Sequence, residues 1–214
     1  MTLHTPIAKK IRAQKYLMQT KQSGLTIVES LVAISILVIA VLGPLVIVSQ
    51  ALRTSFFARD QLTTYYLAQE VIEHVRNLRD KNSLTKTDAL EWLNEITYIS
   101  GSIETSPTIE PIDSPNPKKY RLVRDGGYKL EACPSNDCGK LNVNTVTGVY
   151  GEVSAADMKE SIYTREVVFY QAPGDSLGEQ EVAIEVTLKW NQVGGVYQFK
   201  LRENLLNWKI QKFE

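Results

Sequence analysis

A run of uncharged, mostly apolar residues near the N-terminus constrains this chain more than any other feature. After Glu29 the next charged residue is Arg53. A helix from Leu25 to Gln50 would measure roughly 39 Å at 1.5 Å per residue, against a hydrocarbon core of about 30 Å. The run therefore predicts one tilted helix, residues 25–50, that crosses a lipid bilayer.

The charges that flank this run predict its orientation. Five basic residues and no acidic residue precede it: Lys9, Lys10, Arg12, Lys15 and Lys21. Basic residues beside a spanning helix favour the cytoplasmic side. We expect a single-pass membrane protein with a cytoplasmic N-terminus and an extracytoplasmic C-terminal part.

Glu29 is unusual because it lies close to the start of a spanning helix. A carboxylate carried to mid-bilayer costs roughly 3 kcal/mol, and less near the interface. Glu29 either lies at the level of the lipid headgroups or pairs with a cation. An α-amino group that is freed by cleavage nearby would be a suitable cation.

The segment Gly24-Leu-Thr-Ile-Val-Glu29 resembles the N-terminal signature of type IV prepilins and of type II secretion pseudopilins. A basic leader precedes it and the apolar stretch 30–39 follows it, as in that family. The resemblance implies that prepilin peptidase cleaves between Gly24 and Leu25 and removes leader residues 1–24. It also implies that Leu25 becomes N-methylated, and that Glu29, the fifth mature residue, acts in filament assembly.

Three details of the run leave alternatives open. Leu25 stands where the family most often has phenylalanine. Gly43-Pro44 predicts either a simple kink or a place where the helix loosens on filament packing, since proline removes one helical hydrogen bond. Ser49-Gln-Ala51 loosely resembles a conventional signal cleavage site, but the length of the run argues against cleavage there.

Helical periodicity continues past Gln50 and predicts one long helix over residues 25–80. Apolar residues recur at three- and four-residue spacing. This predicted sheet-facing stripe comprises Ala58, Leu62, Tyr65, Ala68, Ile72 and Val75. Polar residues take the other side, with His74 among them, and a lone histidine gives little reason to propose metal binding or catalysis.

Residues 81–214 predict an extracytoplasmic α+β head. A short helix is expected over 87–96, with Leu90, Leu93 and Ile96 in the core, followed by a proline-rich surface loop over 100–119. Alternating segments predict a β-hairpin over 119–132, a strand over 162–170 and a second hairpin from 182–190 and 196–201. The predicted fold is a long N-terminal helix, transmembrane and then amphipathic, packed against an antiparallel β-sheet.

Cys133 and Cys138 are separated by four residues and have no second cysteine pair or nearby histidine in sequence, so they do not form a zinc motif. A disulfide is favoured over free thiols, and closing so short a loop would stabilise the fold by roughly 2 kcal/mol.

No enzymatic motif or cofactor site is visible, and 24 basic residues balance 24 acidic ones, which gives no indication of nucleic-acid binding. We therefore expect a structural subunit, a minor pilin or pseudopilin, of a type IV pilus or a type II secretion-like filament. Its expected partners are prepilin peptidase, other pilin or pseudopilin subunits, the inner-membrane assembly machinery and the lipid bilayer. The alternative is an extracytoplasmic binding domain that is tethered by an uncleaved transmembrane helix.

Overall fold

The structure is a computed structural model that describes Gly24 and residues 26–99, 102–103, 106–124, 127–151, 157–172, 180–192 and 194–208. The predicted leader up to residue 23 and the predicted methylation position Leu25 lie outside the described residues. The chain divides into two compact units, residues 1–53 and 54–214, which are described separately.

The first unit contains the start of helix α1 (Ile27–Thr85). Of the described residues, those of α1 form the one helix that is long and apolar enough to cross a membrane. The hydroxyls of Ser35 and Ser49 donate hydrogen bonds to the carbonyls of Leu31 and Leu45, one turn earlier. These bonds satisfy the serine hydroxyls within an apolar segment. The helix continues through Pro44 without interruption.

The second unit combines the later part of α1 with two β-sheets. In the described residues of this unit the larger sheet has eight strands in the order β11-β10-β9-β4-β5-β1-β2, with β3 paired to β9. Most pairs are antiparallel, while β1 with β5 and β3 with β9 are parallel. Its strands are β1 (Thr97–Ile99), β2 (Ser102–Ile103), β3 (Ile109–Glu110), β4 (Tyr120–Arg124), β5 (Tyr128–Ala132), β9 (Tyr163–Gln171), β10 (Glu181–Gln192) and β11 (Gly195–Leu206).

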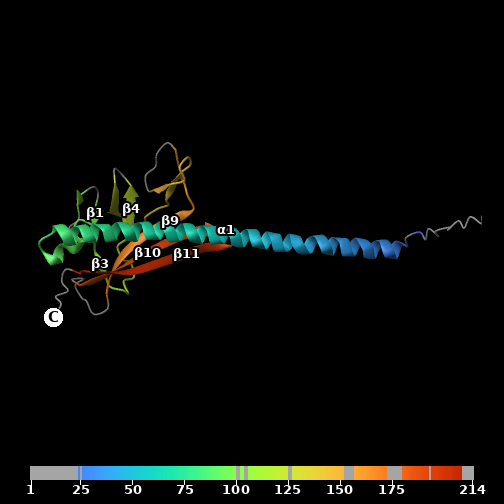
Figure 1. Cartoon of the computed structure of the whole chain (residues 1–214), viewed down its shortest axis with the longest axis horizontal. Coiled ribbons are helices and arrows are strands. Elements are labelled where there is room, and N and C mark those ends of the chain that lie inside the picture. Colours follow the sequence, from blue (N-terminus) through green and yellow to red (C-terminus); the bar gives the residue numbers. More distant parts are fainter. Residues whose placement is uncertain are drawn as a thin grey trace, which may run out of the picture. The chain divides into compact units, whose positions relative to one another are not determined.

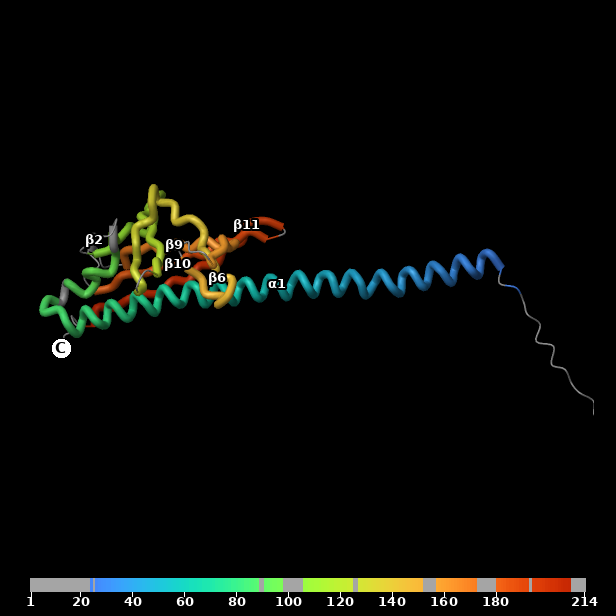
Figure 2. The backbone as a smooth tube through the Cα atoms, turned by 90° about the horizontal axis from the view of Figure 1, so that it is seen from above, coloured from blue at the N-terminus to red at the C-terminus, as the bar shows by residue number. Residues whose placement is uncertain are grey.

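The remaining elements are short. The smaller sheet has the order β7-β6-β8, and two 3-10 turns, η1 and η2, flank the β4–β5 hairpin in sequence. Their bounds are β6 (Asn142–Asn144), β7 (Tyr150–Gly151), β8 (Met158–Glu160), η1 (Ala89–Leu93) and η2 (Pro134–Asn136). Figures 1 and 2 show the teal and green part of α1 running along β9, β10 and β11.

One hydrophobic core lies between α1 and the larger sheet. The helix contributes buried side chains at three- and four-residue spacing, and the long strands contribute alternate residues. The main contributors are Leu67, Ala68, Val71, Ile72 and Val75 from α1, and Leu122, Leu130, Val167, Phe169, Ile184, Val186 and Leu188 from the sheet. The predicted α+β fold, a long helix packed against an antiparallel sheet, is therefore confirmed.

Both predicted hairpins are present. Leu122 pairs with Leu130 in the antiparallel β4–β5 hairpin, and Trp190 pairs with Tyr197 in the β10–β11 hairpin. The turn residues 125–126 and 193 lie outside the described residues. Strand β11 extends to Leu206, and the backbone N–H of Asn207 donates to the Gln180 carbonyl at 2.7 Å. The C-terminal segment is thus fixed to the sheet up to that point.

The prediction for the helix face was wrong in its first half. Ala68, Ile72 and Val75 are buried as expected, but Leu62 and Tyr65 are 54% and 42% exposed. Ala58 is also exposed, and Asp60 and Thr64 face the sheet instead. The cause is that both side chains are hydrogen-bonded where they are buried: Asp60 accepts from Tyr163 and Gln192 of the sheet, and the Thr64 hydroxyl donates to the Gln61 carbonyl of its own helix. The spacing of apolar residues does not reveal such bonds.

Three smaller expectations also need correction. Helix α1 ends at Thr85, five residues after the predicted end. The expected helix over 87–96 is the 3-10 turn η1, in which Leu93 and the following Ile96 are buried as expected, whereas the side chain of Leu90 lies outside the described residues. The segment 100–119 is more than a surface loop, because it supplies β3 to the larger sheet.

Candidate functional site

The candidate site is the start of α1, where the prepilin-like signature lies. Gly24 and Thr26 precede the helix and are exposed. The Thr26 hydroxyl accepts a hydrogen bond from the backbone N–H of Glu29 at 3.2 Å, and the Thr26 carbonyl accepts one from the N–H of Ser30 at 3.0 Å. Thr26 is therefore the N-cap of α1.

This role of Thr26 was not predicted above. Threonine followed three residues later by glutamate, just before an apolar run, is the pattern of a capping box and would have identified it. Glu29 occupies the first turn, where the helix dipole favours negative charge. Its side chain is exposed and forms no ion pair with the residues that the structure describes.

The first part of α1 presents an apolar surface on all sides. In its most apolar stretch no residue is buried within the structure. The exposed large side chains include Leu31, Ile36, Leu37, Ile39, Leu45 and Ile47. An exposed apolar surface that is larger than a few hundred Å² marks a contact with membrane or protein.

Further along α1, Asp60 fastens the helix to the sheet. The carboxylate is 5% exposed and accepts hydrogen bonds from the Tyr163 hydroxyl at 3.0 Å and from Nε2 of Gln192 at 3.2 Å. Burial raises the pKa of Tyr163, and the hydrogen bond to Asp60 raises it further, so this phenol stays protonated as a donor.

Arg165 of β9 makes a second connection. Its side chain is 2% exposed, and Nη1 donates to Glu70 of α1 at 2.7 Å and to the Leu67 carbonyl at 3.1 Å. Nη2 donates to the Leu122 carbonyl of β4 at 3.3 Å. One guanidinium therefore joins the helix to two strands.

Two more polar contacts hold α1 near its end. Nε of Arg76 donates to Glu203 of β11 at 2.6 Å, so the last long strand is also joined to the helix. The buried amide of Asn82 donates to the carbonyls of Trp92 and Asn94, which follow the helix. These contacts make the later part of α1 an integral element of the second unit.

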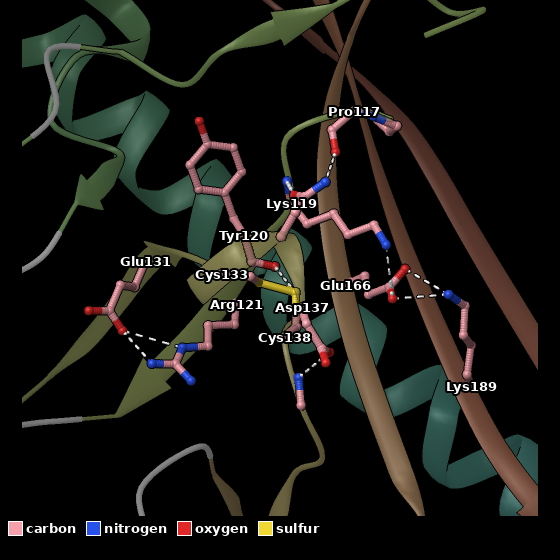
Figure 3. The surroundings of a disulfide bond; sticks show 12 residues. Pro117, Lys119, Tyr120, Arg121, Glu131, Cys133, Asp137, Cys138, Glu166 and Lys189 are labelled. Carbon is pink, nitrogen blue, oxygen red and sulfur yellow. Dashed lines mark hydrogen bonds and ion pairs between the residues drawn. A yellow bond between two sulfur atoms is a disulfide. The ribbon is translucent and has the colours of Figure 1, made fainter. Parts of the chain in front are cut away.

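The disulfide between Cys133 and Cys138 is present in the structure and lies beside β4 (Figure 3). It closes the loop that contains Asn136, whose side chain accepts from the Lys119 backbone N–H at 2.8 Å and donates to the Pro117 carbonyl at 2.9 Å. The loop thus fixes the chain where the proline-rich segment enters β4, which is a structural role.

His74 lies half-buried, although the helical periodicity predicts it on the polar side of the helix. Its ring centroid is 5.6 Å from that of Tyr128, and its Nε2 is buried without a hydrogen-bond partner among the described residues. Burial lowers the pKa of His74, and the negative charge of Glu70 opposes this in part. The neutral imidazole is therefore the form that the fold favours.

This lowered pKa predicts a loss of stability in mild acid. The unfolded chain takes up the proton near pH 6.5, whereas the folded chain does so only at lower pH. The free energy of unfolding should fall as the pH decreases from about 6.5 through the folded pKa. His74→Gln, which stays neutral, should show a smaller decrease in urea midpoint between about pH 7.5 and 5.5. Equal decreases in both proteins would contradict this role of His74.

The chain was compared with family models, curated proteins and solved structures, and none of them matches it. Among the described residues, no group of three or more His, Cys, Asp or Glu side chains is placed to hold a metal ion.

Proposed function

We propose that this chain is a structural subunit, a minor pilin or pseudopilin, of a type IV pilus or a type II secretion-like filament. One observation carries the proposal: the first part of α1 is apolar and uncovered, and Glu29 is its only charge before Arg53. The exposed surface requires lipid or other helices around it, and the carboxylate requires a partner wherever water is excluded.

The proposed mechanism begins with cleavage after Gly24 by prepilin peptidase, followed by N-methylation of Leu25. Cleavage creates an α-amino cation four residues before Glu29. In the filament, Glu29 of one subunit pairs with the terminal cation of its neighbour while the apolar surfaces of the two helices leave the lipid. An unpaired charge in this surrounding is costly, so the pair selects the correct register between subunits.

Exposed side chains on the later part of α1 favour a filament subunit, in which the helix contacts other proteins as well as lipid. Phe56, Leu62 and Tyr66 are 52%, 54% and 61% exposed on this part of the helix. A helix that served only as a tether would need no large apolar side chains there. In a filament, these side chains are available to neighbouring subunits and to the assembly machinery of the inner membrane.

Replacement of Glu29 by alanine tests the mechanism. The Glu29→Ala subunit should be inserted and cleaved after Gly24 but should fail to enter filaments, because the neighbouring terminal cation then has no partner. Mass spectrometry of the mature protein reports cleavage and methylation, and immunoblotting of sheared or purified filaments reports incorporation. Glu29→Asp should restore incorporation in part, since it keeps the charge.

Glu73→Ala is the matched control, because it removes an exposed carboxylate from the same helix outside the apolar run. It should be incorporated normally. Normal incorporation of the Glu29→Ala subunit into filaments would contradict the pairing mechanism. An intact N-terminus in the wild-type protein would instead favour the tethered binding domain, which needs no prepilin peptidase.

A further inference from the structure

Strand β11 lies at one edge of the larger sheet and uses only half of its backbone polar groups for pairing with β10. The two strands keep one antiparallel register throughout, and the N–H of Asn207 donates to the carbonyl of Gln180, which continues that register. In an antiparallel pair, residues that exchange hydrogen bonds alternate with residues whose N–H and carbonyl point away. The residues of β11 that point away from β10 are therefore Val196, Gln198, Lys200, Arg202, Asn204 and Leu206.

These outward backbone groups are open to an additional strand. All the outward-pointing residues are exposed, and within the described parts of the chain β10 is the one strand that pairs with β11. The strand is 12 residues long and contains no proline. A long, regular edge of this kind is a template for strand addition, because each free N–H and carbonyl can gain a hydrogen bond.

The face of this edge that lies toward α1 is apolar. Tyr197, Phe199 and Leu201 belong to this face and are only partly buried. The ring of Phe199 lies 6.3 Å from that of Tyr65 of α1, which is 42% exposed. Leu62, three positions before Tyr65, shares its side of the helix and is 54% exposed. A strand added to β11 would therefore find apolar contacts for every second side chain.

The opposite face of the edge is basic. Nζ of Lys200 lies 2.8 Å from Glu185, and the Lys200 side chain remains 50% exposed. The guanidinium carbon of Arg202 lies 5.6 Å from the centroid of the Tyr170 ring, and Arg202 forms no ion pair with a residue that the structure describes. An acidic side chain on an additional strand would therefore gain a cationic partner in Arg202.

The same charges argue against a second copy of this chain at the edge. Two β11 strands that pair antiparallel over residues 196–206 would place Lys200 of each copy opposite Arg202 of the other. A shift of the register by two residues places Lys200 opposite Lys200, or Arg202 opposite Arg202. Like charges that lie directly opposite each other destabilise a strand pair. The edge is therefore suited to a chain of a different sequence.

We propose that the free edge of β11, residues 196–206, binds an extended segment of a partner protein as an additional strand. The segment alternates apolar side chains, which contact Leu62 and Tyr65, with acidic side chains, which face Lys200 and Arg202. Backbone hydrogen bonds hold the segment, and the alternating side chains select it. This surface does not include the apolar part of α1, so the binding role is additional to the proposed function and independent of it.

A peptide that alternates valine and glutamate tests strand addition directly. It is added to the isotope-labelled full chain in mild detergent, and amide hydrogen exchange is followed for each residue by NMR. We expect exchange to slow by at least about tenfold at positions 198, 200, 202 and 204, whose N–H groups gain partners. The amides at positions 199 and 201 already donate to β10 and should change little.

Two control peptides separate strand addition from simple attraction of charge. One has lysine in place of glutamate, and the other carries N-methyl groups that block alternate backbone N–H donors. Each should bind at least about tenfold more weakly than the valine–glutamate peptide, because one meets like charges and the other loses backbone hydrogen bonds.

A pair of variants tests the role of Arg202. Arg202→Gln should weaken binding of the valine–glutamate peptide by about three- to fivefold, the effect of one exposed ion pair. Arg124→Gln is the matched control, since the Arg124 guanidinium also lies over a tyrosine ring, 5.4 Å from the centroid of Tyr128, but on β4. The Arg124→Gln variant should bind the peptide normally.

Three results would overturn this role of the β11 edge. The first is unchanged exchange at positions 198–204 in the presence of about 1 mM peptide, which is a weak affinity limit. The second is equal binding of the glutamate and lysine peptides. The third is slowed exchange at these positions in concentrated protein without peptide, which would assign the edge to a second copy of the chain. None of these measurements involves Glu29, so the proposed filament function is tested separately.

Discussion

Replacing Arg165 by alanine is expected to destabilise the second unit by about 3–5 kcal/mol, the usual effect of removing one partner from a buried ion pair. The value should lie toward the lower end, because the Glu70 side chain is 30% exposed and can regain water. The loss also includes the carbonyls of Leu67 and Leu122, which lose a charged donor. Urea unfolding of the full chain in mild detergent, followed by tryptophan fluorescence, measures this change.

Arg121→Ala provides the matched control. Arg121 also pairs with a carboxylate on the sheet, Glu131, but the two side chains are 26% and 29% exposed. Partly exposed pairs contribute about 0–1 kcal/mol. A similar loss for Arg165→Ala and Arg121→Ala would contradict the role assigned to Arg165.

A double replacement separates the ion pair from the packing around it. Arg165→Met combined with Glu70→Leu removes both charges and keeps apolar volume at the junction of helix and sheet. Buried ion pairs are often replaced by packed apolar side chains at little cost. The double variant should therefore regain much of the stability that Arg165→Ala loses. A double variant that is less stable than the single one would show that the guanidinium acts mainly through the carbonyl contacts.

The long strands were predictable because the alternation of inward and outward side chains alone determines their pattern. In Val182 to Trp190 the alternation of apolar and polar residues matches the two faces of a sheet, and the following Gly194-Gly195 marks the turn. The same rule places Arg165 in register with the inward residues Tyr163 and Val167. A charge at such a position needs a distant partner, and nothing in the local sequence identifies Glu70 as that partner.

The face of α1 that packs on the sheet could be predicted only where apolar side chains make the contact. Ala68, Ile72 and Val75 follow the periodic pattern, but the first turns of the second unit are held by Asp60 and its donors. The donors Tyr163 and Gln192 lie over one hundred residues away in sequence. Tertiary hydrogen bonds of this kind leave no periodic signal, so Leu62 and Tyr65 were assigned to the wrong side.

At the start of α1 the situation is reversed, since local sequence carries nearly all the information. Thr26 and Glu29 form a local cap whose geometry depends on neighbouring residues alone. The cap uses only the backbone N–H of Glu29, so it does not require a carboxylate at this position. Capping by Thr26 should therefore persist in Glu29→Asp and Glu29→Ala, while the negative charge persists only in Glu29→Asp.

Truncation of Trp190 to alanine is expected to cost about 3–5 kcal/mol, the usual range for a large aromatic side chain in a core. The side chain is 2% exposed, its ring stacks on Tyr197, and the centroid of the Phe57 ring lies 6.2 Å away. Its loss removes one ring contact between the hairpin and α1, while the contact of Phe57 with Tyr197 and the hydrogen bond from Gln192 to Asp60 remain. Urea unfolding followed by circular dichroism of the full chain measures the effect without depending on this tryptophan.

Trp190→Phe should be much better tolerated than Trp190→Ala. Within the described residues the indole Nε1 is buried and has no hydrogen-bond partner, and such an unsatisfied donor costs about 1–3 kcal/mol. Phenylalanine keeps an aromatic ring beside Phe57 and Tyr197 and removes that donor. Trp208→Ala, at a position that is 44% exposed, should change stability by less than about 0.5 kcal/mol. Equal losses of stability for Trp190→Ala and Trp190→Phe would contradict the view that an aromatic ring at this position helps to pack the hairpin against α1.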